Sequence, residues 1–261
     1  MIIKHELRSN LKMLLIWTIC IAGFDFVMLL MYPSLQESMA EIAASADKLG
    51  TFGTAFGMDQ LNIGTPLGFY GTYIGVMLAL CGAMFAAILG AGILSKEEGG
   101  HTVEYLFTLP YSRVHVVIQK VLAVLALIVI FEIVNLLLGM LGLEIIDADV
   151  PMAKILLYHV GQTFLHLEVA AIGILISACN KKVNLGIGLG VALLFYFMDM
   201  MARIFEQLKG FQYITPFYYS NAVDVLNSGK IEPVLLIIGI VITIASIIAA
   251  GFVYNRRDLA A

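Results

Sequence analysis

Six long runs of apolar residues constrain this chain of 261 residues more than any other feature of its sequence. A helix needs about 20 predominantly apolar residues to cross the hydrocarbon core of a bilayer. The chain is 61% hydrophobic and 13% charged, whereas a soluble domain has about 25% charged residues with which to cover its surface. The runs therefore predict an all-α, polytopic membrane protein with one domain over residues 1–261, and they exclude a soluble enzyme. The predicted transmembrane helices cover about residues 13–32, 69–94, 114–143, 155–178, 184–202 and 234–254.

The distribution of Lys and Arg residues predicts how these helices are oriented. Ten of the 15 Lys and Arg residues lie on one side of the predicted layout, and five lie on the other. In most membrane proteins the side richer in positive charge faces the cytoplasm. We therefore expect a multi-pass protein of the cell membrane with both termini in the cytoplasm. The net charge of −4 gives no basic surface suited to nucleic acid, so membrane lipid is an expected partner and nucleic acid is not.

Three segments at the ends of the predicted spans carry structural predictions. Residues 1–12 place apolar side chains at roughly helical spacing with charges between them, which predicts an amphipathic helix on the inner leaflet. An ordinary basic flank is an equal alternative for this segment. Pro33 is expected to mark the exit from the first span. Residues 203–232 contain an aromatic cluster, and aromatic rings favour the headgroup level, so this loop is expected to dip into the outer interface.

The loop at residues 95–113 is the most informative segment between two spans. Ser95 and Glu98 have the spacing of a capping box, in which two side chains bond the free backbone N–H groups of a helix start. Pro110 is expected to end this short helix, and Ser112 can cap the next one. The loop therefore predicts a short helix held between two spans on the cytoplasmic side.

This predicted helix has an apolar stripe. Val103, Leu106 and Phe107 follow one another at the spacing of one helical face. Such a stripe suits a hydrophobic groove on a partner protein. Packing onto the chain's own helices or onto the lipid surface is the alternative.

The same loop resembles the ABC-2 type transporter permease family. The motifs occur in the family's order as Glu97-Glu98, Thr102-x-Glu104-Tyr-Leu-Phe and Leu109-Pro110-Tyr111-Ser112-Arg113. Gly100-His101 precedes Thr102 where Arg-Gly is common in the family, so local contacts can differ there. The order of six spans, with a loop before the last one, extends the resemblance over nearly the whole chain.

The resemblance implies a division of labour between two kinds of subunit. In the family this loop forms a coupling helix that contacts a separate ATP-binding subunit, and the permease works as a homodimer or a pseudo-symmetric heterodimer. Family substrates include drugs, peptides, lipids and polysaccharides, which are usually exported. The residues expected to contact the ATP-binding subunit are Glu97, Glu98, Thr102, Val103, Glu104, Leu106, Phe107, Pro110 and Arg113.

Motifs for catalysis are absent from the sequence, which agrees with this division. There is no G-x-x-x-x-G-K-[ST] sequence, the loop that cradles nucleotide phosphates. The sequence shows no plausible catalytic set of a nucleophile, a base and an acid. It also shows no group of residues with metal-ligand spacing. We therefore expect no enzymatic activity and no cofactor on this chain, with ATP and Mg²⁺ bound by the partner subunit.

Polar side chains inside the predicted spans need an explanation, because an ionisable group in the hydrocarbon costs roughly 2.5–3.5 kcal/mol on insertion scales. One interpretation is that they line a hydrated cavity or relay protons. The other is that they form hydrogen bonds between helices, each contributing about 0.6 kcal/mol on average. These candidates are Asp25, Glu132, Asn135, His159, Gln162, His166 and Glu168.

Small residues offer a similar choice between two interpretations. Gly82 and Gly90 share a face with alanines, and Gly186-x-x-x-Gly190 has the spacing that lets helices approach closely. These faces are expected to pack within one bundle, and a seam between two copies is the alternative.

Three functions remain in competition at this level. The leading one is the permease subunit of an ABC exporter. The second is an ion-coupled secondary carrier that uses Glu132, His166 and Glu168 for protons, although the sequence shows no inverted repeat. The third is a membrane sensor or immunity subunit in which ATP use gates a signal.

Overall fold

The computed structural model describes residues 2–45, 50, 53, 57–58, 60–100, 102 and 111–257. None of these residues lies in a β-strand. Within them, six helical stretches are long and apolar enough to cross a membrane, which confirms the predicted all-α polytopic fold. In chain order the stretches are Ile2–Ala44, Pro66–Ile93, Arg113–Ile145, Met152–Cys179, Leu185–Ile204 and Pro233–Arg256.

The first two stretches each contain a π-helical turn. The first consists of α1 (Ile2–Thr18), the π turn η1 (Ile19–Gly23) and α2 (Phe24–Ala44). The second consists of α4 (Pro66–Phe69), the π turn η3 (Tyr70–Ile74) and α5 (Gly75–Ile93). The other long helices are α8 (Arg113–Ile145), α9 (Met152–Cys179), α10 (Leu185–Ile204) and α13 (Pro233–Arg256). The short helices are α6 (Lys96–Gly99), the 3₁₀ helix η4 (Glu206–Tyr213), α11 (Pro216–Tyr219) and α12 (Ala222–Ser228).

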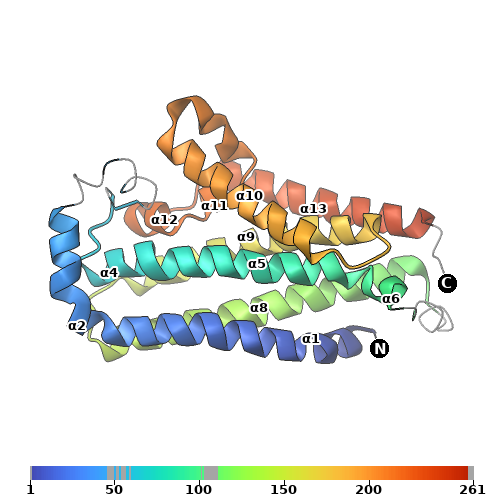
Figure 1. Ribbon diagram of the computed structural model, residues 1–261, viewed down its shortest axis with the longest axis horizontal. Coiled ribbons are helices and arrows are strands. Elements are labelled where there is room, and N and C mark those ends of the chain that lie inside the picture. Colours follow the sequence, from blue (N-terminus) through green and yellow to red (C-terminus); the bar gives the residue numbers. More distant parts are fainter. Residues whose placement is uncertain are drawn as a thin grey trace.

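The long helices run side by side, with α5 and α9 at the centre (Figure 1). Helix α1 packs along α8 on one side of this pair, and α13 packs against α9 on the other. Both chain termini and α6 lie at the same end of the bundle, which is the arrangement that an even number of spans produces.

Glycines on the central helices allow their close approach. A Cβ atom on Gly82 would lie 2.4 Å from the His166 ring, and one on Gly90 would lie 2.3 Å from the carbonyl oxygen of Ala170. The prediction that this face packs within one bundle is confirmed. It is wrong for Gly186 and Gly190, which are exposed and have no neighbour from another helix near their Cβ positions.

The first helical stretch differs from its prediction at both ends. The helix begins at Ile2 and continues without a break, so residues 1–12 are not a separate amphipathic helix. The physical reason is that Ile2 and Glu6 are buried against the bundle, which turns this face toward protein. Pro33 does not end the helix either, since α2 continues to Ala44. Figure 1 shows that α2 bends at its far end, and a proline inside a helix is a common cause of such a bend.

One of the two predicted caps in the loop before α8 is confirmed. The Ser112 side chain accepts a hydrogen bond from the backbone N–H of His115 and caps α8. Ser95 precedes α6 but makes no capping bond, so the predicted capping box is wrong. Its hydroxyl is buried at the contact with α9, where Ser177 Oγ donates to it over 3.1 Å.

The segment between α10 and α13 folds back along α9. Gln162 Nε2 donates to the backbone oxygen of Ser220 over 2.6 Å, and the Tyr219 hydroxyl donates to Glu168 over 3.0 Å. Glu168 lies 16 residues after Met152, which places it about 24 Å along α9. This segment therefore reaches past the middle of α9.

Candidate functional site

The predicted contact with an ATP-binding subunit lies only partly within the described residues. Val103, Glu104, Leu106, Phe107 and Pro110 are outside them, so the apolar stripe stays a prediction. The remaining residues of that prediction are described, namely Glu97, Glu98, Thr102 and Arg113. Each of these four has contacts within the chain.

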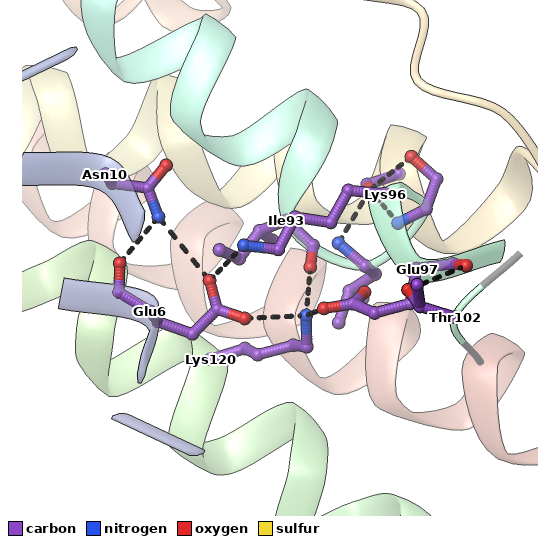
Figure 2. A network of polar contacts seen from close by, with 10 residues as sticks. Glu6, Asn10, Ile93, Lys96, Glu97, Thr102 and Lys120 are labelled. Atoms are coloured by element: carbon purple, nitrogen blue, oxygen red, sulfur yellow. Dashed lines mark hydrogen bonds and ion pairs between the residues drawn. The ribbon is translucent and has the colours of Figure 1, made fainter. Parts of the chain in front are cut away.

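Lys120 of α8 is the centre of a buried charge cluster (Figure 2). Its ammonium nitrogen lies 3.0 Å from Glu6 Oε1 on α1, 2.5 Å from Glu97 Oε1 on α6, and 2.6 Å from the backbone oxygen of Ile93. A lysine ammonium group has three N–H donors, and here each has an acceptor. Because the Lys120 side chain is 0% exposed, removing either carboxylate would leave part of its charge unpaired in the interior.

Further contacts tie Glu6 to its surroundings. Lys96 of α6 forms an ion pair with the second carboxylate oxygen of Glu6. Asn10, one turn further along α1, donates to the backbone oxygen of Glu6 over 2.8 Å. Glu6 thus links the start of α1 to α6 and to α8 at once (Figure 2).

Arg257 forms a second cluster at the same end of the bundle. It makes an ion pair with Glu98 of α6 and donates to the backbone oxygens of Ala178 and Asn180, each over 2.7 Å. Arg113, the first residue of α8, donates to the backbone oxygen of Arg257 over 2.6 Å. Burial lowers the pKa of Arg257 from its ordinary value, but arginine remains protonated in proteins because that value exceeds about 12.

We call these six residues the terminal network: Glu6, Lys96, Glu97, Glu98, Lys120 and Arg257. The network joins α6 to α1, α8, the end of α9 and the end of α13. Movement of α6 would therefore pull on four of the long helices.

A separate polar site lies between α8 and α9. Glu132 Oε1 is 2.5 Å from Nδ1 of His166, and Glu132 Oε2 is 3.3 Å from Nδ1 of His159. The two histidines are seven residues apart, which places them on one face of α9. Nε2 of His159 lies 2.8 Å from the hydroxyl of Tyr70 in the π turn η3. We call Glu132, His159, His166 and Tyr70 the mid-helix site, and all four are buried.

The other predicted polar residues make no hydrogen bond to the mid-helix site among the described residues. Asn135 donates to the backbone oxygen of Phe131 in its own helix. Asp25 is buried after the π turn η1, and its Oδ1 atom has no hydrogen-bond partner. Gln162 and Glu168 instead contact the segment before α13. Of the seven candidates, Glu132, His159 and His166 therefore come together in the mid-helix site, and the other four lie elsewhere.

Sequence reasoning missed most of the terminal network as a contact site. Lys96 and Lys120 are among the ten Lys and Arg residues on the predicted cytoplasmic side, and Glu6 is one of the charges at residues 1–12. None of the three was predicted to make a contact. Lys120 carried a usable signal, since it is the only Lys or Arg within the apolar run at residues 114–143. Tyr70 carried none, because an aromatic residue in an apolar run is ordinary. Tyr219 belongs to the aromatic cluster at residues 203–232, which predicted a place at the membrane interface and not a bond to α9.

Neither site is arranged as a metal centre. Among the residues that the structure describes, no group of three or more His, Cys, Asp or Glu side chains is arranged to hold a metal ion. The two sites can instead hold helices together and change their contacts when a helix moves.

Comparison with known proteins identifies the family. A search of curated protein sequences found no match. A family model described as "ABC-2 family transporter protein" matches residues 1–259. Because this match covers nearly the whole chain and the fold contains six candidate spans, the protein is a multi-pass membrane protein that belongs to the ABC-2 transporter family.

Proposed function

We propose that the chain is the permease subunit of an ABC exporter of the cell membrane. A separate ATP-binding subunit would bind ATP and Mg²⁺, and a second copy or a homologous permease would complete the pathway. Both termini would face the cytoplasm. The cargo would be a drug, a peptide or a lipid-like molecule. The observation that carries this proposal is the terminal network, which connects α6 to four long helices at the end where both termini lie.

The network suggests how a movement outside the membrane would reach the bundle. An ATP-binding subunit that docks on residues 101–110 would push on α6, which directly precedes this segment. Glu97 would pass the force to α8 through Lys120, whose side chain is fully buried. Glu98 would pass it to the end of α13 through Arg257. A charge-assisted hydrogen bond in a buried place is strong and directional, so these contacts suit the transfer of force.

An ion-coupled carrier is a weaker proposal, although the mid-helix site gives it some support. Carboxylate and imidazole groups inside a membrane occur in the proton relays of pumps and transporters. The family match favours ATP as the energy source. An ATP-gated sensor or immunity subunit would use the same contacts and differs only in its output.

The proposal is tested by purification of the full chain from its own membranes in a mild detergent. We expect an ATP-binding subunit to copurify. The double substitution Leu106→Asp with Phe107→Asp should remove that subunit while the permease keeps its elution volume in size-exclusion chromatography. Purification of the chain alone, together with transport that needs only a proton gradient, would contradict the proposal and favour the carrier.

A further inference from the structure

The segment between α10 and α13 encloses a groove of about 610 Å³. Pockets that bind small molecules have volumes of about 300–1,000 Å³, so the groove is large enough for one. Three tyrosines line it, Tyr213, Tyr218 and Tyr219, together with apolar side chains such as Leu235. Two acidic residues, Asp224 and Glu232, and one basic residue, Lys230, complete its charged lining.

A buried carboxyl group lies directly behind this groove. Glu168 is 1% exposed and accepts a hydrogen bond from the Tyr219 hydroxyl. It borders a small adjoining void that shares Tyr213, Tyr219 and Leu235 with the groove. Gly239 makes room for the carboxyl group, because a Cβ atom there would lie 2.5 Å from Glu168 Oε2. An acidic side chain kept at this depth along α9 is costly.

The charges around the groove are predominantly negative. Arg203 of α10 forms ion pairs with Asp199 over 3.1 Å and with Asp224 over 2.7 Å. One positive charge thus meets two negative ones. Glu232 and Glu168 add two more carboxyl groups, and Lys230 opposes them from the lining.

The tyrosine rings add a second preference for cations. The face of an aromatic ring attracts a positive charge placed over it. One such contact lies beside the groove, since the Arg203 guanidinium carbon is 4.8 Å from the centre of the Tyr218 ring. Tyr213 is 52% exposed, so its ring is open to an external cation. Tyr219 is buried and lies between the groove and Glu168.

We propose that this groove binds a monovalent organic cation with apolar substituents. The tyrosine rings and Leu235 would contact its apolar groups, and Glu168 and Glu232 would attract its charge. As a cargo site, the groove rests on the proposed exporter function; as a binding site, it stands without it. The same chemistry could come from a soluble ammonium compound or from the choline headgroup of a lipid.

The test is equilibrium binding of radiolabelled tetraphenylphosphonium to the purified full chain in a nonionic detergent. We expect saturable binding that Glu168→Gln and Glu232→Gln each weaken about three- to tenfold. Lys230→Gln should instead strengthen it, because this change removes the opposing charge. Glu206→Gln is the matched control, since Glu206 is exposed, pairs with Lys209 and lies outside the groove lining. Tetraphenylborate, which has nearly the same shape and a negative charge, should not compete.

The outcomes separate the claims. Equal binding by the wild type, Glu168→Gln and Glu232→Gln, or strong competition by tetraphenylborate, would overturn the cation site. Glu232 is exposed on the rim, so its variant gives a result even if Glu168→Gln does not fold. Displacement by dihexanoyl phosphatidylcholine but not by dihexanoyl phosphatidylglycerol would assign the groove to lipid headgroups. Because no ATP-binding subunit is present, failure of the exporter proposal would not change these results.

Discussion

The terminal network and the mid-helix site both bury charged or ionisable side chains, but they connect different parts of the chain. The terminal network joins residues up to about 250 positions apart, from Glu6 on α1 to Arg257 after α13. The mid-helix site joins α8 to α9, the next helix along the chain, and adds Tyr70 from η3. The first is centred on a basic group between two acids, and the second on an acid between two imidazoles.

This difference indicates separate tasks. A network that connects helix ends through α6 is suited to pass on movement from outside the bundle. A site midway along two packed helices is suited to hold them in register, which agrees with the hydrogen-bonding interpretation of the polar residues. Glu132, His159 and His166 line neither the groove beside Tyr213 nor the void that adjoins it. Substitutions should therefore separate transport defects at one site from stability defects at the other.

The largest effect is expected from Lys120→Met. This change leaves the buried carboxylate of Glu6 and the partly buried carboxylate of Glu97 without their shared cation. Breaking a buried ion pair by removing one partner costs about 3–5 kcal/mol. Thermal unfolding in detergent should show a large loss of stability, with Lys182→Met as the control because Lys182 is exposed. An unchanged unfolding temperature would show that the network is not a structural hub.

A smaller effect is expected from Gly82→Ala, which perturbs the mid-helix site by packing. The new methyl group would overlap the His166 ring and push it from Glu132. Overpacking of this kind costs about 1–3 kcal/mol. Gly190→Ala is the matched control, because no atom of another helix lies near its Cβ position. If Gly82→Ala unfolds at the same temperature as the wild type and Gly190→Ala, α5 and α9 do not pack closely at Gly82.

Glu132→Gln tests the mid-helix site by its chemistry. A glutamine has one acceptor oxygen in place of two, so it cannot accept hydrogen bonds from both histidines in the same way. We expect a loss of about 1–2 kcal/mol, measured by thermal unfolding beside Glu144→Gln, an exposed acid in the same helix. Transport and its pH dependence should remain. Loss of transport at unchanged stability would revive the proton-relay interpretation.

The smallest effect on stability is expected from Lys96→Met. This residue is partly exposed and contributes one ion pair, with Glu6, so its loss should cost about 1 kcal/mol or less. It therefore tests the role of the network in transport without unfolding the chain. Size-exclusion chromatography and thermal unfolding would check that the variant folds.

The long helices were predictable from sequence because hydrophobicity alone requires them to cross the membrane. The continuation of the first helix through Pro33 could not be predicted, since a proline inside a helix and one at its end look alike in a sequence. Periodicity placed His159 and His166 on one face of α9. It could not show that Glu132 on α8 faces them, because the relative rotation of two helices depends on packing between residues far apart in the sequence. Lys120 and Glu6 lie 114 positions apart, and no local pattern connects them.

The most direct test of the account compares transport with ATP hydrolysis in proteoliposomes that contain the permease and its copurified ATP-binding subunit. The account predicts that Lys96→Met keeps the ATP-binding subunit and hydrolyses ATP, but moves less cargo per ATP than the wild type and the Lys182→Met control. This result would place the terminal network on the path from ATP to transport. An unchanged ratio of cargo to ATP in the folded Lys96→Met variant would contradict the account.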